Sequence, residues 1–469
     1  MLKLFLWLRY LRKKKIVYLS IAAIALSVSL LIVVASLFTS FIGAFERSAV
    51  EAMGDVVLTA PTKFAKYPLF IERLEQTHAV EAATAVLSAQ GLLHLGKGNV
   101  RAVNIWGIEP GRRAKVTDYK RFLLKQKDSP GEPTFEIADS RQGEGPAVVP
   151  IGIPPAEGLP ERIGGFVGIA VAAEPDEKTD EYDDSAVKAM FGQQAVLTTG
   201  APAPAFRKED AGGQEQVKRR AVKFTIVDVF QTGVYELDKR FVYLPIEQLQ
   251  KILYPDEQAQ LADQIQIKLA DDIQIDDALA QIRGVWQVFA EEQLEGAPHF
   301  IKYTDIETAK QMQSRYIAEL WKQMGVLLLI FGVVDCSVIV LIFCIFYMIV
   351  MTRRRDIAIV KSCGAASSSV TFVFVGFGIC VGMIGSVLGA FLGYVITKNI
   401  NTIEGWIRII FGLKLWKSSV YMFSRIPNDV NWPSALQIIL LAVAAAAIGA
   451  LIPAVIAART RPVDILRYE

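Results

Sequence analysis

The chain alternates four long apolar runs with polar segments. Three of the runs, 16–45, 370–397 and 435–458, carry no charged residue, and the fourth, 324–351, carries only Asp335. About 20 apolar helical residues cross the roughly 30 Å hydrocarbon core of a bilayer. The pattern therefore predicts four membrane-spanning helices. A cleaved signal peptide has a core of about 7–15 residues, so the longer first run is expected to be an uncleaved anchor.

Lysine and arginine near the span ends predict the orientation, because these residues are enriched on the cytoplasmic side. They cluster before the first span, after the second and after the fourth. Both termini are therefore expected in the cytoplasm, with residues 46–304 outside. The segment 398–434 argues the other way, since it places these basic residues outside: Lys398, Arg408, Lys414, Lys417 and Arg425. We expect the even number of crossings and the N-terminal basic cluster to determine the orientation, so that 398–434 lies outside.

Residues 46–304 have the composition of a soluble domain. Short β-rich runs alternate there with amphipathic helical runs, which is typical of an α+β fold. The strand candidates are DVVLTAP, AVVPIGI, QAVLTTG, FTIVDVF, RFVYLPI and QIQIKLA. The polar segments 125–145, 174–184 and 201–216 are expected to be surface loops. The predicted fold class is membrane α-helical, with four transmembrane helices and a large α+β extracytoplasmic domain between helices 1 and 2.

The chain divides accordingly into successive segments. These are 1–45 (cytoplasmic N-terminus and helix 1), 46–304 (extracytoplasmic domain), 305–351 (stalk and helix 2), 352–369 (cytoplasmic loop), 370–397 (helix 3), 398–434 (short external loop), 435–458 (helix 4) and 459–469 (cytoplasmic tail). The first run exceeds the bilayer thickness as a helix, and no Gly or Pro interrupts the chain between 305 and 324. Helices 1 and 2 are therefore expected to continue as stalks outside the membrane.

The loop between the second and third spans reads MTRRRDIAIVKSCGAASSS. Its middle can form a short amphipathic helix over 356–361, and Gly364 suits the C′ position after such a helix. A serine among 367–369 is expected to cap the third span. The loop is thus predicted to be an ordered helix at the membrane surface, anchored at lipid phosphates by Arg353, Arg354 and Arg355.

Four stretches carry a resemblance to one family. RDIAIVKSCGA, after the second span, contains in order an acidic residue, Ile, Ala, a basic residue and Gly-Ala. This order resembles the signature found at the same place in MacB/FtsX-type ABC transporter permeases, in which either Ala or Gly follows the Ile. FTIVDVFQTGVYELDKRFVYLPIEQLQKIL and PAVIAARTRPVDILRYE are similar to that family's external domain and closing segment. VYMFSRIPNDVNW resembles the segment before the last span in the lipoprotein-releasing (LolC/LolE-like) subgroup.

The resemblance implies a permease subunit that couples ATP hydrolysis by a separate ABC ATPase subunit to extraction of lipoproteins, or of another amphiphile, by mechanotransmission. ATP and Mg would be bound by that partner, and no cofactor is expected in this chain. A dimer with a second permease copy or a related permease is also implied, in the bacterial inner membrane. Whether an external lipoprotein chaperone docks stays open. The coupling positions carried over are Asp356, Ile357, Ala358, Lys361, Gly364 and Ala365. Cys363 departs from the larger apolar residue usual in the family.

Two other functions stay open beside this one. An FtsX-like transmembrane signalling scaffold would control an external cell-wall hydrolase without moving cargo, and a MacB-like permease would export peptides or drugs. A secondary transporter is disfavoured, because it would need more spans and more polar residues within them.

The remaining motifs point away from catalysis in this chain. No G-x-x-x-x-G-K-[ST] phosphate loop occurs, so the ATPase must be another polypeptide. The three histidines lack ligand spacing, no C-x-x-C pair occurs, and no metal site is indicated. A formal net charge of +2 gives no case for nucleic-acid binding.

Two features inside the spans have a predicted role. A carboxylate in a span is costly, so Asp335 is expected to face protein or water. It would belong either to a polar interface or cavity between permease subunits, or act as a structural hydrogen-bond acceptor. The third span carries a glycine stripe that predicts close packing against the alanine-rich fourth span or the first span. The stripe consists of Gly378, Gly382, Gly385, Gly389 and Gly393.

Overall fold

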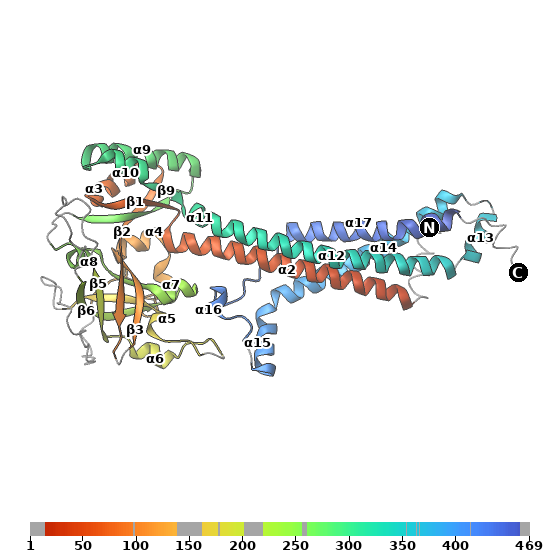
Figure 1. The fold of residues 1–469 in the computed structure, drawn as a ribbon, viewed down its shortest axis with the longest axis horizontal. Coiled ribbons are helices and arrows are strands. Elements are labelled where there is room, and N and C mark those ends of the chain that lie inside the picture. Colours follow the sequence, from red (N-terminus) through yellow and green to blue (C-terminus); the bar gives the residue numbers. More distant parts are fainter. Residues whose placement is uncertain are drawn as a thin grey trace, which may run out of the picture. The chain divides into compact units, whose positions relative to one another are not determined.

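The computed structural model describes residues 15–96, 99–137, 162–176, 179–200, 219–255, 260–352, 354–362, 364, 366–412 and 414–459. The chain forms two compact units (Figure 1). The membrane unit contains residues 1–44, 315–406 and 426–469, and the α+β domain contains residues 45–314 and 407–425. The chain therefore passes between the two units four times.

The membrane unit is built from four long helices. These are α2 (Lys15–Met53), α12 (Ser314–Thr352), α14 (Ser367–Lys398) and α17 (Trp432–Arg459), each long and apolar enough to cross a membrane. The four predicted spans are confirmed. Helices α2 and α12 contain 39 residues each, which corresponds to about 58 Å and exceeds the roughly 30 Å hydrocarbon core.

The glycine stripe of α14 divides between two neighbouring helices. A Cβ on Gly378 or Gly382 would lie 2.5 Å from Ala450 Cβ or 2.7 Å from Ala446 Cβ on α17. A Cβ on any of the three later glycines would meet α2, where the nearest residues are Ile24 for Gly385, Ala25 and Val28 for Gly389, and Ile32 for Gly393. The glycines thus let α14 approach α17 with one part of its length and α2 with the next.

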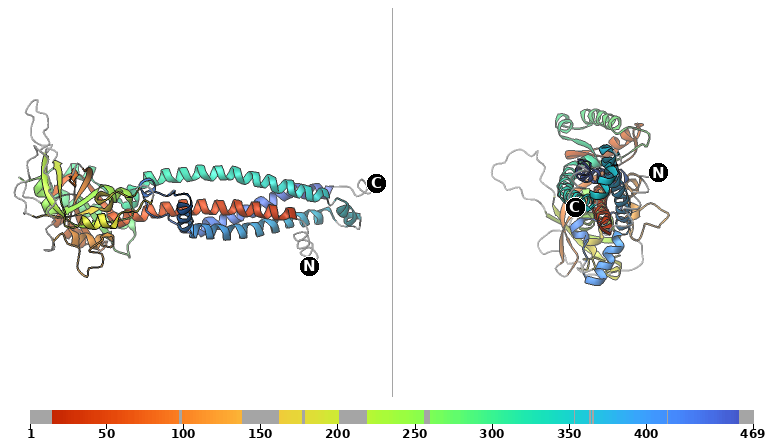
Figure 2. Two further views of the ribbon diagram at one scale, coloured as in Figure 1. Left: turned by 90° about the horizontal axis from the view of Figure 1, so that it is seen from below. Right: turned by 90° about the vertical axis from the view of Figure 1, so that its right-hand side faces the viewer.

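Helix α12 packs into the membrane unit mainly with its C-terminal half; in its N-terminal half only Leu320 and Met324 are buried. In the C-terminal half, Ile342, Phe346 and Ile349 are buried among the other helices. In the N-terminal half, Leu329 and Val333 are 68% and 66% exposed. Figure 2 shows this half of α12 (teal) running apart from α2 (red).

The chain before α12 differs from the expected continuous helix. Residues 305–308 form strand β9 (Asp305–Thr308), which pairs antiparallel with β1 (Val56–Ala65), and Thr308 then caps α11 (Ala309–Met312) with a capping box. Pairing with an available strand outweighs local helix preference here. The continuous-helix prediction is therefore wrong for 305–308, which form a strand, and the helix is interrupted at Gln313 before α12 begins at Ser314.

The α+β domain is built on one nine-stranded sheet in the order β3-β7-β4-β6-β5-β2-β8-β1-β9, with an additional β2–β3 pairing that closes six strands into a ring. The long strand β2 makes this possible, because its first half pairs with β8 and its second half with β3 and β5. The other strands are β2 (Val80–His94), β3 (Val100–Ile108), β4 (Gly164–Gly168), β5 (Gln194–Gly200), β6 (Arg219–Phe230), β7 (Phe241–Pro245) and β8 (Leu261–Leu269). Five predicted strand runs are confirmed, and AVVPIGI lies outside the described residues.

Helices cover the extension of this sheet beyond the ring. Near β1 and β9 lie α3 (Tyr67–Glu75), α9 (Ile275–Gln293) and α10 (Ala297–Tyr303) (Figure 1). Their shared core is aromatic: Phe64 and Phe70 each place their ring 5.1 Å from that of Trp286, and Phe289 is 5.0 Å from Phe70. The remaining short helices are α4 (Pro110–Val116), a 3₁₀ turn (Tyr119–Phe122), α5 (Ile169–Ala172), α6 (Asp184–Ala189), α7 (Tyr235–Arg240) and α8 (Ile246–Leu253).

The last turns of α2 are held by the α+β domain. Arg113 is 1% exposed, lies 4.9 Å from the rings of Trp106 and Tyr243, and donates to Ala52 O at 2.9 Å. A cation at a helix C-terminus is favourable because carbonyl groups are unpaired there. Gly54, at φ +82°, ends the helix in the left-handed region.

The segment between α14 and α17, expected as a short external loop, contains two further helices. They are α15 (Ile400–Phe411) and α16 (Ser418–Tyr421). Its residues 407–425 form part of the α+β domain, so they lie on the same side of the membrane as residues 45–314. This agrees with the parity of four crossings, despite the basic residues.

We predict that Gly389→Ala destabilises the membrane unit. The new Cβ would lie 2.6 Å from Ala25 O and 2.8 Å from Val28 Cβ, and such overpacking typically costs about 1–3 kcal/mol. Gly325→Ala is the matched control, because Gly325 in α12 has open space around it, and alanine is the better helix former. Thermal unfolding in detergent should show a lower midpoint only for Gly389→Ala; equal midpoints would contradict the close contact.

Candidate functional site

The loop between α12 and α14 forms the predicted short helix. Helix α13 spans Arg354–Ser362, and Gly364 follows it at φ +92° with its N–H donating to Lys361 O. The predicted serine cap of α14 is wrong: Ala366 is the N-cap residue and no side chain caps it. The loop is thus ordered mainly by α13 itself and the glycine that ends it.

Helix α13 is attached to the membrane unit through three of the predicted coupling residues. Ile357 and Ala358 are 7% and 1% exposed, and Ile357 belongs to the apolar core of the four spans. Lys361 Nζ donates to Ala458 O at 2.7 Å, near the C-terminal end of α17, where a cation is favourable. A displacement of α13 would therefore act directly on the packed ends of the spans.

The opposite face of α13 presents different side chains. Arg355 is exposed, and Ile359 is 51% exposed. Ile359 is not among the coupling positions carried over from the resemblance, although an apolar residue two positions from a buried one on a short helix is a usable signal. Of the other predicted residues, Arg353 and Ala365 lie outside the described residues, as do the side chains of Arg354 and Asp356.

Asp335 lines a groove within the membrane unit. Its Oδ1 accepts a hydrogen bond from Ser27 Oγ of α2. The groove, about 470 Å³, lies between α2, α12 and α17, and its lining is mostly aliphatic, with Gln437 and Ser434 among its few polar residues. Asp335 therefore accepts a hydrogen bond between two helices and faces a cavity within this chain, while its place in an interface between permease subunits stays a prediction.

A second arrangement of charged residues joins two distant segments of the α+β domain. Asp180 Oδ2 lies 3.4 Å from Lys414 Nζ and accepts from Ser418 N at 2.8 Å. The two charged side chains are 5% and 11% exposed, and Lys414 also donates to Thr179 O. An exposed pair, Arg408 with Glu181 at 3.0 Å, lies beside it. We call the residues 179–181 and 408–418 the charged clamp.

Backbone pairing continues this attachment. Val234 forms a β-bridge with Phe423, Tyr235 N donates to Met422 O at 2.7 Å, and Ser424 N donates to Gly233 O. The segment 407–425 is therefore held on the α+β domain by buried charge and by main-chain hydrogen bonds together.

Asp238 fixes the turn that receives Phe423. Its carboxylate accepts from Thr232 N and Oγ1 at 2.8 Å and from Gly233 N at 3.1 Å. Burial raises the pKa of Asp238 to about 7, while these hydrogen bonds act to lower the pKa. A buried carboxyl group in this state titrates near neutral pH.

Residues 174–176 and 179–183 form no helix or strand, as expected for a surface loop, but the Asp180 side chain is only 5% exposed because it pairs with Lys414. Acidic residues of that loop are the partners of Arg408 and Lys414, two of the five basic residues that conflicted with the predicted topology. The sequence could not reveal this, because the two segments are more than two hundred positions apart and each alone has the composition of a loop.

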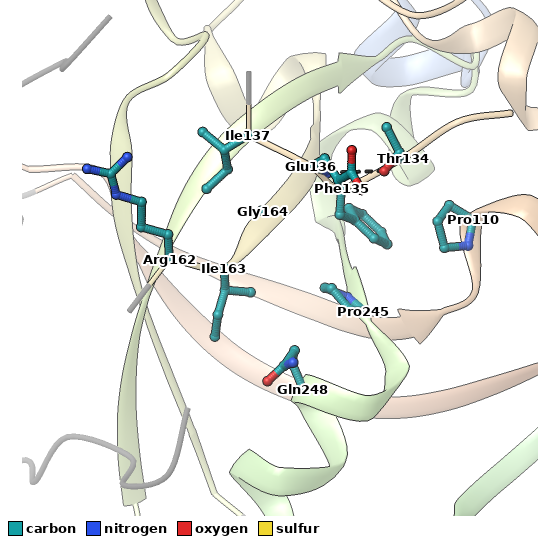
Figure 3. Close-up of a pocket in the computed structure, with 10 residues that line it drawn as sticks. All are labelled: Pro110, Thr134, Phe135, Glu136, Ile137, Arg162, Ile163, Gly164, Pro245 and Gln248. Carbon is teal, nitrogen blue, oxygen red and sulfur yellow. Dashed lines mark hydrogen bonds between the residues drawn. The ribbon is translucent and has the colours of Figure 1, made fainter. Parts of the chain in front are cut away.

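The α+β domain also contains a cavity of about 650 Å³ (Figure 3). Its charged lining residues are Glu136 and Arg162, and Figure 3 shows the guanidinium of Arg162 directed away from Glu136. Among the described residues, no group of three His, Cys, Asp or Glu side chains could hold a metal ion. The geometry of the described part of the chain assigns no chemistry to this cavity.

Comparisons with known proteins match a protein family largely within the membrane unit. Residues 328–462 match the family of the FtsX-like permease C-terminal domain. The chain is 29% identical over 257 residues to the lipoprotein-releasing system transmembrane protein LolC of Xylella fastidiosa, covering 53% of this chain and 56% of that protein. The alignment thus spans little more than half of that relative. A LolC of Neisseria meningitidis is 25% identical over 485 residues, covering 100% of this chain and 99% of that protein.

The periplasmic region of MacB from Actinobacillus actinomycetemcomitans is a structural neighbour. The match has 11% sequence identity and a TM-score of 0.30, and it covers 57% of this chain and 95% of that one. A score this low does not establish a shared fold. Residues 328–462 are thus similar to the FtsX-like permease C-terminal domain. Along its length the chain is similar to LolC-type lipoprotein-releasing transmembrane proteins.

We predict that Lys414→Met releases segment 407–425 from the α+β domain. Removing one partner of a buried ion pair leaves an uncompensated charge and costs about 3–5 kcal/mol. Hydrogen exchange of residues 418–424 should therefore accelerate. Adding Asp180→Asn should restore protection, because asparagine still accepts from Ser418 N. The control is Arg408→Gln, which breaks the exposed pair and should cost at most about 1 kcal/mol. Equal exchange in Lys414→Met and Arg408→Gln would contradict a role for the buried pair.

We predict that the stability of the α+β domain falls as pH rises towards 7. The folded-state pKa of Asp238, about 7, lies above the roughly 3.9 of an unfolded aspartate. The folded state therefore binds more protons between these values, and stability declines by up to about 1.4 kcal/mol per pH unit until pH 7, then levels off. Unfolding of the full chain followed from pH 5 to 8 should show this slope, and Asp238→Asn should flatten it. An unchanged slope in the variant would exclude Asp238 as the source.

Proposed function

We propose that this chain is the permease subunit of an ABC transporter that releases lipoproteins, or another amphiphile, from the membrane. A separate ABC ATPase would hydrolyse ATP and bind Mg, while this chain transmits the motion. The FtsX-like domain and the full-length similarity to a lipoprotein-releasing transmembrane protein support this class. We further propose a bacterial inner-membrane location, with both termini and α13 in the cytoplasm.

The attachment of α13 is the observation that carries the proposal. A loop that serves only as a connector does not need two buried side chains and a lysine bonded to another helix. Here Ile357, Ala358 and Lys361 bind α13 to the ends of the spans. A push on the exposed face around Ile359 would therefore move the spans rather than bend the loop.

The proposed motion continues through the close packing of α14. Its glycines leave no space between α14 and either α2 or α17, so a shift of one helix displaces its neighbours. The chain then crosses between the membrane unit and the α+β domain four times, entering the domain twice and leaving it twice. At one of these crossings Arg113 binds the end of α2, and at two others the charged clamp and the β-bridge hold segment 407–425. Displacement of the spans would thus be transmitted to the domain at several points.

The groove beside Asp335 is the proposed contact for the cargo. Aliphatic side chains of α2, α12 and α17 suit acyl chains, while Asp335 and Gln437 offer polar groups for the boundary with a headgroup or peptide. An amphiphile has both kinds of surface. A groove with a mixed lining fits such a molecule better than it fits a wholly polar solute.

We propose that a second permease, identical or related, packs against α12. The N-terminal half of α12 has an apolar face that no described residue of this chain covers, including Leu329 and Val333. Four spans also provide few helices to enclose a cargo. Pairing of two permeases would place two such grooves together, as symmetric oligomers commonly do.

We predict that Ile359→Asp abolishes association with the ATPase while leaving the chain folded. Ile359 is exposed, so the change removes an apolar contact without disturbing the core. The double variant Asp356→Arg with Gly364→Leu should have the same effect, because it reverses a charge and forces a side chain into the left-handed region. The matched control is Ile452→Ser, an exposed apolar residue of α17 distant in sequence from the loop.

The measurement is copurification of the ATPase, followed by lipoprotein release from proteoliposomes. Both α13 variants should insert normally into the membrane but lose ATPase copurification and lipoprotein release. Ile452→Ser should still copurify with the ATPase. Retained association in both variants, or labelling of Lys361→Cys from the outer side of intact cells, would contradict the coupling role. Normal ATPase binding by the unmodified chain with no release of lipidated protein, but with copurification of a cell-wall hydrolase, would favour a signalling scaffold instead.

A further inference from the structure

Helix α15 has an exposed apolar face in its second half, whereas Ile400, Ile403 and Ile407 are half-buried. None of its residues is buried. Trp406, Ile409, Ile410 and Phe411 are 64%, 78%, 72% and 69% exposed. At 100° per residue these side chains extend over about 200° of the helix circumference. A face this wide exceeds the stripe of roughly 100° that a helix typically buries against a protein core.

The polar face of α15 is the one that contacts protein. Asn401 exchanges two hydrogen bonds of 3.0 Å with the backbone of Ile426, one through Nδ2 and one through Oδ1. Arg408 pairs with Glu181 at 3.0 Å, and Glu404 Oε1 is buried but has no hydrogen-bond partner among the described residues. In a water-soluble protein a surface helix turns its apolar face inward. The reverse arrangement of α15 indicates an apolar surrounding on its outer face.

The apolar face continues the surface of a membrane span. Helix α14 ends at Lys398 and α15 begins at Ile400. At this end of α14, Phe391 and Leu392 are 65% and 46% exposed. Tyr394 stacks on Trp432, the first residue of α17, with 5.8 Å between ring centroids. Tyr and Trp are enriched at membrane–water interfaces, so these rings place the start of α15 at the level of the lipid headgroups.

We propose that α15 is an interfacial helix whose apolar face lies among the acyl chains of the leaflet on the side of the α+β domain. Its occupant is phospholipid. A helix with a wide apolar face opposite a polar face lies in the plane of the interface. Lys398, exposed at the junction, then lies at the phosphate level. The proposal is independent of the cargo and of the ATPase.

Site-directed spin labelling of the full-length chain tests this. The four native cysteines are replaced by alanine, and single cysteines at Ile409 and Ile410 are labelled. The protein is reconstituted in vesicles of phosphatidylethanolamine and phosphatidylglycerol. Collision with oxygen, which partitions into lipid, is compared with collision with a water-soluble nickel chelate. Phe391→Cys on α14 is the lipid-facing control, and Val288→Cys on α9, 50% exposed in the α+β domain, is the water-facing control.

The expected result is an oxygen-to-nickel ratio at 409 and 410 that matches Phe391→Cys and exceeds that of Val288→Cys. The computed depth should be shallower than at position 391. A ratio like that of Val288→Cys would overturn the proposal by showing a water-exposed face. Low collision with both reagents would overturn it as well, because it would show that protein, such as a second permease, covers the face.

Discussion

The close approach of α14 to two neighbours is the constraint on which the membrane unit depends. Lipid tails are as apolar as the side chains of the spans, so helices associate there through dispersion and shape rather than through the hydrophobic effect. Glycines at 378 and 382 admit α17, and those at 385, 389 and 393 admit α2. Helix α12 has no such stripe. It packs mainly through its C-terminal half, and the groove beside Asp335 lies where its packing is incomplete.

The attachments of α13 in the membrane unit and of segment 407–425 in the α+β domain rest on different interactions. In the membrane unit, α13 is held by two buried apolar residues and one lysine bonded to a helix C-terminus. In the α+β domain, segment 407–425 is held by a buried ion pair and a β-bridge. A buried pair adds little net stability over apolar packing, but it is costly to break on one side only. It therefore specifies where the segment binds, which suits a connection that must keep its register while it is moved.

In the proposed arrangement, helix α15 contacts protein on one face and lipid on the other. Asn401 and Arg408 bind protein groups, whereas the apolar side chains at 406 and 409–411 are exposed. Contacts with the α+β domain also explain why two of the basic residues in 398–434 are tolerated on this side of the membrane. Arg408 and Lys414 are paired with acidic residues of the domain, so they are not free charges that compete with the topology signals of the loops.

The sequence alone determined the four spans, most of the strands and the short loop helix, because these follow from apolar run length, local periodicity and a glycine at Gly364. It also indicated that Asp335 needs a polar partner. Only the tertiary structure decided which face of α13 is free, that 305–308 pairs as a strand, and that Asp180 meets Lys414. The reason is physical: periodicity and propensity act over a few neighbouring residues, whereas strand pairing, helix contact and charge pairing join positions that only the folded chain brings together.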